Sequence, residues 1–410
     1  MNSEKGGFRK FLLLWTGELI SSVGGGLTSF GLGVYVFAHT GSAASMALVT
    51  LLGFLPTILL SVPAGVLADR YDRRLLMMLG DGLSALGIIY ILICMMRGEA
   101  TLLQICIGVA VSAVFSALLE PSYRATITDI LTKEEFSKAN GLVSLAGSAR
   151  YLFSPVIAGF LLTVCDVRLL LVIDICTFVI TVICAAIVRK GIVTRIEKND
   201  DSFMTSIKEG WDALSKKRGV LMLVVLSSGI TLFMGMLQIL AEPLILSFTD
   251  AKTLGVAETV CACGMLVSGI ILGIKGIRKS YVKILGISFI MAGLFMIGFG
   301  LRENVILICC FGFLFFASLP IANNCLDYLA RTNIDDSVQG RAWGMIGLIS
   351  QLGYIAAYAV SGVLADLIGD LSGRGVGRGA AYVIQISGIC MSLMAIFIMK
   401  QKSIKELENN

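Results

Sequence analysis

The feature that most constrains this chain is a long apolar run that stops at a short, densely charged turn. No charged residue occurs between positions 43 and 68. Five charged residues then fall within six positions, before a second apolar run begins: Asp69, Arg70, Asp72, Arg73 and Arg74. A membrane-spanning helix needs about 20 apolar residues. The pattern therefore predicts two membrane helices joined by a very short turn.

Apolar segments of this length recur along the whole chain. Of its 410 residues, 56% are hydrophobic and 15% are charged, whereas a soluble domain has roughly 25% charged residues. A soluble core could not absorb so much apolar surface, so the surrounding solvent must be lipid. Twelve spans can be drawn: 10–37, 43–68, 75–97, 100–122, 138–164, 167–188, 219–248, 253–275, 281–301, 304–329, 340–366 and 378–400.

One long connection divides these spans into two sets of six. We expect an all-α integral membrane protein with an N-terminal six-helix half at 1–188, a cytoplasmic linker at 189–218 and a C-terminal six-helix half at 219–410. Apolar residues at helical spacing in the linker predict an amphipathic helix at the membrane surface. This helix is either a tether that packs on the bundle or a regulatory element. Its apolar residues are Phe203, Ile207, Trp211 and Leu214.

Lys and Arg residues are distributed unevenly between the two sides of the membrane. Arg150 lies inside a span, and the loops on one side hold Arg97, Arg168, Lys252, Arg302, Arg374 and Arg378. All other Lys and Arg residues lie on the side of the N-terminus. Because cytoplasmic loops carry the excess of basic residues, we expect both termini in the cytoplasm. We expect a multi-pass protein of a bacterial plasma membrane, with 10–37 as a first span and not a cleaved signal.

A short step of a small residue, glycine and two apolar residues repeats in four of the spans. Its glycines are Gly65, Gly159, Gly269 and Gly362, at almost equal spacing in the two halves. In two spans the match extends to Gly-Val-Leu-Ala-Asp, at 65–69 and 362–366, so Asp69 has a counterpart at the opposite face of the membrane. Inverted three-helix repeats nested in two six-helix halves are typical of transporters with alternating access.

The twelve spans, the long central loop and the charged turn resemble the major facilitator superfamily over the whole chain. The residues of the turn that carry the resemblance are Gly65, Asp69, Arg70, Arg73 and Arg74. Asp72 stands where the family usually has a second glycine, which resembles the branch of macrolide exporters and the enterobactin exporter. Further features shared with that branch are Thr40-Gly41-Ser42, Pro56, Pro63, Ala139-Asn140-Gly141 and Gln339-Gly340-Arg341. The resemblance implies proton-linked efflux of a drug-like or natural-product molecule.

The fifth span carries a reduced form of the Gly-Pro…Gly-Gly signature of the family's antiporters. It reads Ser154-Pro155…Ala158-Gly159, preceded by Gly147. Proline and small residues permit a bend and close packing against a neighbouring helix. The resemblance to antiporters is therefore partial, with departures at Ser154 and Ala158.

The charged turn suits a conformational latch between the two halves. Gly65 permits close approach of a partner helix, and Asp69 can meet the positive N-terminus of a helix in the other half or pair with Arg73. Arg70, Arg73 and Arg74 can bind carboxylates and lipid phosphates. The alternative is that these basic residues serve topology alone, by keeping the loop in the cytoplasm.

Charged side chains inside the spans are the candidates for proton coupling, because such charges are costly in lipid. Glu18 and Asp174 can take up and release a proton as an intermittently wet cavity opens to either side. Arg150 is a counter-ion for either carboxylate or, alternatively, part of a structural ion pair. We expect Asp81 to be a helix-end residue near the arginine cluster. Interfacial positions are expected for Glu120, Glu242 and Asp327.

The remaining expectations concern ligands. An apolar, aromatic cavity is predicted for the substrate, with Trp15, Tyr35, Tyr151, Phe233, Met236 and Tyr354 as candidate wall residues. The eleven cysteines and the single histidine lack metal-ligand spacing, so we expect no metal and no cofactor. The partners expected are a small-molecule substrate, protons and the lipid bilayer, with no nucleic acid and a monomeric state.

Two other functions remain open at this stage. One is a proton-coupled solute importer of the same fold, which transport measurements in inverted vesicles would distinguish from an exporter. The other is a membrane sensor or enzyme that transports nothing. The chain has no phosphate-binding Gly-x-x-x-x-Gly-Lys-[Ser/Thr] loop and no nucleophile with a nearby base, so we expect neither direct ATP drive nor catalysis.

Overall fold

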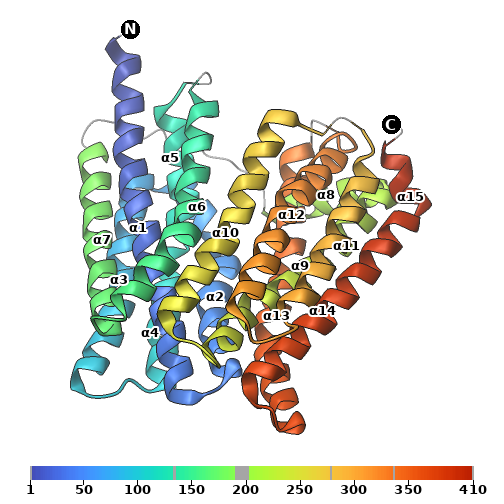
Figure 1. Ribbon diagram of the computed structural model, residues 1–410. Helices are drawn as coiled ribbons and strands as arrows, with labels where there is room; N and C mark the ends of the chain where they lie inside the picture. Colours follow the sequence, from blue (N-terminus) through green and yellow to red (C-terminus); the bar gives the residue numbers. More distant parts are fainter. Residues whose placement is uncertain (1, 133–134, 190–202, 278, 336–337, 409–410) are drawn as a thin grey trace. The chain divides into compact units, whose positions relative to one another are not determined.

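The computed structural model describes residues 2–132, 135–189, 203–277, 279–335 and 338–408. Within these residues every regular element is helical and no strand occurs. Twelve of the helices are long and apolar enough to cross a membrane. The all-α membrane fold predicted from the sequence is therefore confirmed (Figure 1).

The chain divides into two compact units. Met1–Thr40 and Leu48–Asn199 form the first unit, and Gly41–Ala47 joins Asp200–Asn410 in the second. The start of the second long helix therefore groups with the second unit. The expected halves and linker remain predictions, and the part of the linker at 190–202 lies outside the described residues.

The helices of the first unit follow one another closely along the chain. A single break at Ala117–Leu118 divides the fourth span into α4 and α5, and α5 extends well beyond the predicted end at 122. The helices are α1 (Asn2–Thr40), α2 (Ala43–Arg70), α3 (Arg73–Arg97), α4 (Leu102–Ser116), α5 (Leu119–Ile130), α6 (Phe136–Leu161) and α7 (Val167–Arg189).

The second unit begins with an amphipathic helix, in which Leu214 is buried and Trp211 is exposed. Its membrane helices are followed by a short C-terminal helix, in which Ile404 is fully buried. The helices are α8 (Phe203–Lys216), α9 (Arg218–Leu246), α10 (Ala251–Lys275), α11 (Tyr281–Phe299), α12 (Val305–Arg331), α13 (Gln339–Ser372), α14 (Gly375–Lys400) and α15 (Lys402–Lys405).

Small residues permit the helices of each unit to pack closely. In the first unit, α1 lies against α6 and α7, and α3 lies against α4 and α7. A Cβ atom at Gly26 of α1 would lie 2.6 Å from Ser154 Cβ of α6, so only glycine fits there. In the second unit, a Cβ atom at Gly293 of α11 would lie 2.4 Å from Gly388 O of α14, so only glycine fits there as well.

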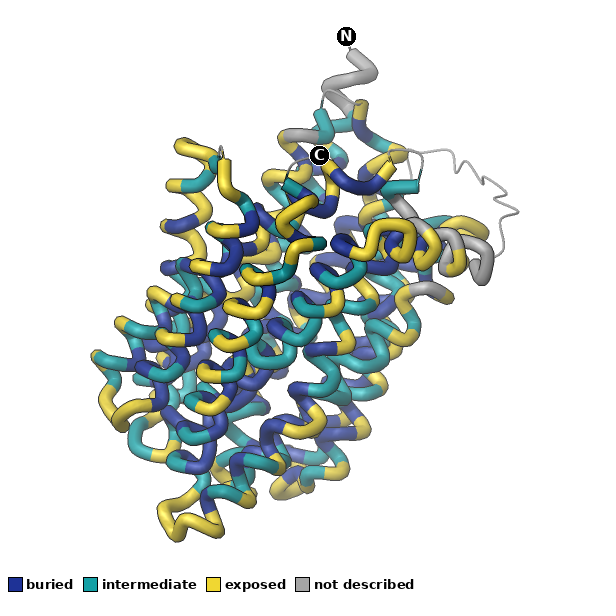
Figure 2. The backbone as a smooth tube through the Cα atoms, turned by 90° about the vertical axis from the view of Figure 1, so that its right-hand side faces the viewer, coloured by how far each residue is buried: buried dark blue, intermediate teal, exposed yellow. Residues whose placement is uncertain are grey.

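Large apolar side chains also lie on the surface of the spans. Figure 2 shows exposed residues recurring along most of the helices, between buried ones. A soluble protein rarely exposes so much contiguous apolar surface, and in a membrane these side chains meet lipid. Among the most exposed are Leu59, Met96, Leu103, Ile274 and Leu371.

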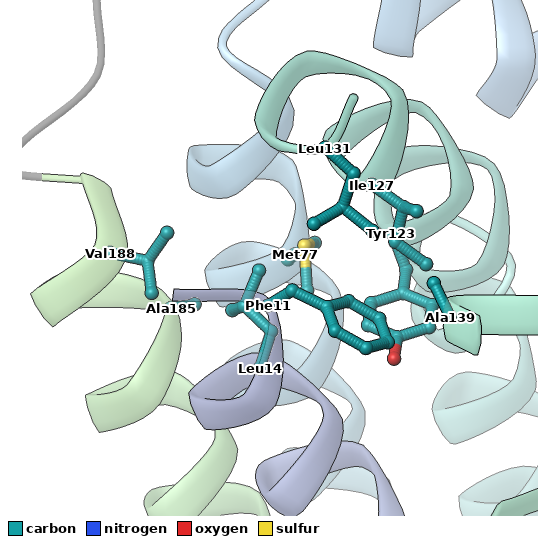
Figure 3. Close-up of a cluster of buried hydrophobic side chains, with 9 residues drawn as sticks. All are labelled: Phe11, Leu14, Met77, Tyr123, Ile127, Leu131, Ala139, Ala185 and Val188. Carbon is teal, nitrogen blue, oxygen red and sulfur yellow. The ribbon is translucent and has the colours of Figure 1, made fainter. Parts of the chain in front are cut away.

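A cluster of buried side chains closes one end of the first unit (Figure 3). Phe11 and Leu14 of α1, Met77 of α3 and Ala185 of α7 meet Tyr123 of α5 there. Ile127, Leu131, Ala139 and Val188 complete the cluster. It fixes the relative register of five helices, α1, α3, α5, α6 and α7, and this register positions the polar residues that follow along each helix.

Candidate functional site

Asp129 of α5 holds the charged turn after α2 within the first unit. Arg73 Nη1 donates a hydrogen bond to Asp129 Oδ1 at 2.5 Å, and Arg74 Nη2 donates to Asp129 Oδ2 at 3.0 Å. The Arg74 side chain is 0% exposed, so it depends on this carboxylate. Arg73 also donates to the carbonyl oxygens of Ala68 and Ala125. The two arginines thus bind a carboxylate that belongs to their own unit.

Asp72 begins α3 and ties it to α7. Its side chain accepts a hydrogen bond from the Arg74 backbone N–H at 3.1 Å, and Arg189 Nε donates to its second oxygen at 2.7 Å. This residue, which departs from the usual family pattern, therefore has a structural part in the turn. It serves as the N-cap of α3 and as the partner of a basic residue at the end of α7.

The other latch candidates remain without a partner helix in the described part of the chain. A Cβ atom at Gly65 would meet nothing within 4 Å. The exposed Asp69 side chain has Arg73 as its neighbour at 3.8 Å, on the next turn. Arg70 is exposed and forms no hydrogen bond or ion pair with the described residues. The predicted role of this group as a latch stays a prediction. We refer to Gly65 and Asp69 as the Asp69 step.

The counterpart at Asp366 does engage another helix, inside the second unit. Asp366 lies on α13, and its Oδ1 accepts a hydrogen bond from the backbone N–H of Ala43 at 2.9 Å. Its Oδ2 accepts from the Ala44 N–H at 3.1 Å and from the Ser42 hydroxyl at 2.6 Å. Ser42 Oγ in turn accepts from the Ser45 N–H at 3.1 Å. The free N–H groups that begin α2 are thus satisfied by a carboxylate at the positive end of the helix.

Gly362 makes this contact sterically possible. It lies one turn before Asp366 on α13, and a Cβ atom there would lie 2.5 Å from Ala43 O and 2.6 Å from Ala44 Cα. Both distances are too short for a side chain facing backbone atoms. We call the group of Ser42, Ala43, Ala44, Gly362 and Asp366 the Asp366 clasp.

Both predicted coupling carboxylates lie in the interior of the first unit. The Asp174 side chain on α7 is 1% exposed and accepts a long hydrogen bond from Thr177 Oγ1 at 3.4 Å. A Cβ atom at Gly24 of α1 would lie 2.9 Å from Asp174 Oδ1. Glu18 is half-buried on α1, with the Ser22 hydroxyl 3.5 Å from its Oε1. These positions suit proton exchange, which stays a prediction.

Arg150 does not form an ion pair with either carboxylate within the described residues. It is exposed on α6, and its Nη2 donates to the Ser29 hydroxyl of α1 at 3.0 Å. Its charge nevertheless acts electrostatically on both Glu18 and Asp174. Its proposed role as their counter-ion therefore rests on longer-range attraction in this structure.

The expected position of Asp81 is wrong. Because α3 begins at Arg73, Asp81 lies two turns inside the helix and not at its end. Its side chain is 1% exposed, and its Oδ2 atom finds no hydrogen-bond partner among the described residues. The helix enters the protein interior from its first turn, since Arg74 is buried as well. Asp81 therefore belongs with the buried carboxylates.

The antiporter-like motif of α6 packs against α1. Ser154, which stands where the family has glycine, donates a hydrogen bond from its hydroxyl to Val23 O at 3.0 Å. Pro155 and Gly159 are buried within α6, while a Cβ atom at Gly147 would meet nothing within 4 Å. The motif thus contributes to the contact between two helices, and any part of Gly147, Pro155 and Gly159 in transport remains a prediction.

The predicted cavity-wall residues lie in different surroundings. Trp15 is tied to α6, because its Nε1 donates to Leu142 O at 2.6 Å. Met236 is buried, with the Ser387 hydroxyl donating to its sulfur at 3.1 Å. Phe233 is half-buried on α9, and Tyr354 of α13 packs against Gly235 of α9. Tyr151 is 57% exposed on α6. Their shared role in a substrate cavity stays a prediction.

Tyr35 lines a separate pocket of about 240 Å³ at the end of the first unit. Its hydroxyl accepts a hydrogen bond from the Ala100 N–H at 3.0 Å, and its ring stacks on the chain's single histidine, His39, at 3.9 Å between centroids. Residues between helices, such as Glu99 and Asp166, also line this pocket. It therefore lies at the helix ends and not in the membrane interior.

Asp129 and the partner of Asp366 could not be identified from the sequence. The predicted fourth span ended at 122, which assigned Asp129 to a loop, although the helix continues to Ile130. One signal could have indicated the role of Asp129. It lies four residues after Ala125, on the face of α5 that meets Arg73. The clasp joins residues more than three hundred positions apart, which no local pattern records.

Known membrane transporters resemble this chain over most of its length. Residues 14–358 match the model of the Major Facilitator Superfamily. Macrolide efflux protein A of Streptococcus pyogenes is 26% identical over 368 residues, which cover 88% of this chain and 90% of that protein. The staphyloferrin A transporter of Staphylococcus aureus is 22% identical over 412 residues, which cover 98% of both chains.

The fold has counterparts among solved structures. A bacterial homologue of the iron transporter ferroportin matches with a TM-score of 0.72 at 15% identity, over 96% of this chain and 99% of that one. At this level of identity the likeness concerns the fold. It agrees with the twelve spans found here.

Proposed function

The chain belongs to the Major Facilitator Superfamily, and we propose that it exports a hydrophobic drug-like or natural-product molecule in exchange for protons. The family and the twelve spans make it a multi-pass transporter of a bacterial cell membrane. In our proposal both termini are cytoplasmic and the protein acts as a monomer. The residues predicted for the cavity wall would bind the apolar part of the cargo.

The proposed cargo follows from the relatives. Macrolide efflux protein A aligns with 88% of the chain, which supports a macrolide as the first substrate to test. The staphyloferrin A transporter aligns with 98% of the chain, which supports a siderophore as the second. Export of a macrolide would confer resistance to it.

Proton coupling rests on one observation, the burial of the Asp174 carboxyl in a membrane-spanning helix. An ionised group at such a place costs about 2.5–3.5 kcal/mol on insertion scales, which a structural residue would avoid. In the proposed cycle, Asp174 and Glu18 take up protons from one side of the membrane and release them to the other. Arg150 stabilises their ionised forms through its charge.

The two glycine–aspartate steps are proposed to alternate as contacts between helices. The predicted orientation places the Asp366 clasp at the outer face and the Asp69 step at the cytoplasmic face. The clasp shows what such a step can bind, namely the free N–H groups at the start of a helix. By analogy, Asp69 would cap a helix start in the state in which the Asp366 clasp is open.

Transport in inverted membrane vesicles tests this function. Vesicles from a bacterium without its major efflux pumps should accumulate radiolabelled erythromycin when an inward-acidic pH gradient is imposed, and a protonophore should abolish accumulation. Glu18→Gln and Asp174→Asn should lose this response, while Glu303→Gln, whose carboxyl lies between two spans, should keep it. Accumulation that survives collapse of the proton gradient would contradict the proposal.

A further inference from the structure

The register of the buried cluster places three polar positions together in the first unit. Leu14 of α1, Met77 of α3 and Ala185 of α7 belong to one cluster (Figure 3). Four residues further into the bundle along each of these helices lie Glu18, Asp81 and Thr181. Residues four apart share one face of a helix, so these positions form the next layer, about 6 Å deeper. All three belong to membrane-spanning helices.

The polar face of α7 continues beyond this layer. Thr181, Thr177 and Asp174 follow at intervals of four and three residues, and all three are buried. Gly24 of α1 lies against Thr177 and Asp174. Gly24 is six residues beyond Glu18. The Asp174 carboxyl therefore lies roughly 9 Å along the bundle from the layer of Glu18, Asp81 and Thr181, which we call the first layer. The threonine hydroxyls between the layers donate to backbone oxygens and keep lone pairs free to accept.

We call the series of Glu18, Asp81, Thr181, Thr177 and Asp174 the polar track. Buried polar atoms without partners lie along it. Glu18 Oε2, Asp81 Oδ2 and the Tyr123 hydroxyl have no hydrogen-bond partner among the described residues. Tyr123 belongs to the cluster next to the first layer, and its hydroxyl is the one oxygen drawn in Figure 3. Buried polar atoms are nearly always satisfied, so three unsatisfied atoms together indicate a ligand that supplies hydrogen bonds.

The ligand that fits this track is a proton. In the described part of the chain, no three His, Cys, Asp or Glu side chains come close enough together to hold a metal ion. Asp81 forms no ion pair there, and α4, which packs against α3, carries no charged side chain. Two neighbouring carboxylates repel each other, and a proton on one of them removes this repulsion.

We propose that Asp81 is a third proton-exchanging carboxyl, which links Glu18 to Asp174 along this polar track. It is the group that interacts electrostatically with both of the others. In each transfer, an O–H bond of one carboxyl breaks and an O–H bond forms on the next carboxylate, directly or through a threonine hydroxyl, and no redox partner takes part. The groups that interact electrostatically with Glu18 or Asp174 are Arg150, Glu120 and the Tyr123 phenol. The buried Arg74 lies seven residues before Asp81 on α3 and is paired with Asp129.

The inference rests on the proposed proton-coupled export, so its test needs one measurement that is independent of transport. Infrared difference spectra between acid and neutral pH, recorded on the protein in lipid, detect each carboxyl that gains a proton. Asp81→Asn should remove one carboxyl band and shift others. Ser84→Ala, which alters a buried hydroxyl on the next turn of α3, should leave the carboxyl bands in place. An unchanged set of bands in Asp81→Asn overturns the proposal.

Transport then tests whether this proton is coupled to export. In proteoliposomes, Asp81→Asn should reduce accumulation of radiolabelled erythromycin driven by a pH gradient at least tenfold. Exchange of labelled for unlabelled erythromycin without a gradient should continue, which shows that the variant is folded. Asp81→Glu should restore part of the gradient-driven accumulation. Full gradient-driven accumulation by Asp81→Asn overturns the relay. Should the wild type itself accumulate no erythromycin, the proposed cargo fails, and the infrared spectra still decide whether Asp81 exchanges a proton.

Discussion

The two glycine–aspartate steps share a sequence and differ in what they contact. At 362–366, Gly362 lies against the backbone of Ala43 and Ala44, and Asp366 binds their N–H groups. At 65–69, no described atom lies within 4 Å of a Cβ at Gly65, and Asp69 is exposed beside Arg73. The same five residues therefore form a tight helix contact in one place and a free helix end in the other.

This difference suggests that the step is a binding element whose partner depends on the state of the protein. Three hydrogen bonds to a carboxylate, each worth about 1.5–3 kcal/mol when a charged group takes part, make a strong contact. Moving a two-state equilibrium from 1:99 to 99:1 takes about 5.5 kcal/mol. Two such contacts that exclude each other would hold the two states of a transporter near balance.

The largest expected effect comes from the residue that anchors the charged turn. Asp129→Ala should lower the free energy of unfolding by about 3–5 kcal/mol, because it leaves the buried Arg74 without its partner. Thermal unfolding in detergent measures this loss. Asp69→Ala removes only an exposed ion pair, worth about 0–1 kcal/mol, and is the control. Equal losses in the two variants would show that the turn is not anchored by Asp129.

Removing the charge of the clasp should act on transport and leave folding intact. Asp366→Asn keeps the shape of the side chain but weakens its hydrogen bonds to Ala43, Ala44 and Ser42. A loss of about 1.5–3 kcal/mol corresponds to a change of roughly tenfold to a hundredfold in the balance of states. Gradient-driven efflux should fall accordingly at normal expression. Wild-type efflux by Asp366→Asn would mean that the clasp has no part in the cycle.

A methyl group at the contact should have a somewhat smaller effect. In Gly362→Ala, the added Cβ would lie 2.5 Å from Ala43 O, so α13 and the start of α2 must separate. Overpacking of this kind costs about 1–3 kcal/mol. Efflux should fall about tenfold, whereas Gly273→Ala, where a Cβ meets nothing within 4 Å, should retain full activity. Similar losses from both substitutions would show that alanine affects these helices in some other way.

The smallest effect is expected from the hydroxyl that completes the clasp. Ser42→Ala removes the acceptor for the Ser45 N–H and a donor to Asp366, at a cost of about 0.5–2 kcal/mol for a helix cap. Efflux should fall by a factor of about two to thirty on that scale.

A helix cap made within a single helix is the matched control for Ser42. Asp250 Oδ1 accepts from the Thr253 N–H at 2.8 Å, and hydrogen bonding to Thr253 holds the pKa of Asp250 below its usual range. The stabilisation by this cap is present at neutral pH and is lost as the pH falls through the lowered pKa. Asp250→Ala should therefore weaken the start of α10 without changing efflux at neutral pH. A loss of efflux equal to that of Ser42→Ala would assign both effects to helix capping in general.

The sequence predicts the parts of this molecule that hydropathy and charge record directly. The twelve spans follow from apolar runs, and helix α8 coincides with the spacing of Trp211 and Leu214. Hydropathy does not record a helix that continues beyond the apolar zone, so it does not indicate that α5 extends to Ile130 and includes Asp129. The burial of Asp81 is hidden for a related reason, because a charge near the start of an apolar run usually marks the membrane surface, whereas α3 is buried from its first turn.

Contacts between distant segments require the structure itself. The repeat of Gly-Val-Leu-Ala-Asp indicated that Asp366 matters, but not that it binds Ala43 and Ala44. Likewise, the register that brings Glu18 and Asp81 into one layer depends on how Leu14 and Met77 pack. Helical periodicity gives the face of each residue, and the packing of side chains then decides which faces meet.

Amide hydrogen exchange at the start of α2 tests most directly whether the two steps exclude each other. The N–H groups of Ala43 and Ala44 bond to Asp366, and without that carboxylate the first turn of a helix leaves them free. Mass spectrometry of the peptide containing residues 42–46 reports their protection in protein held in lipid. We predict faster exchange in Asp366→Asn and slower exchange in Asp69→Asn, relative to wild type. Exchange that is unchanged in Asp69→Asn, or altered in the same direction in both variants, would contradict the account.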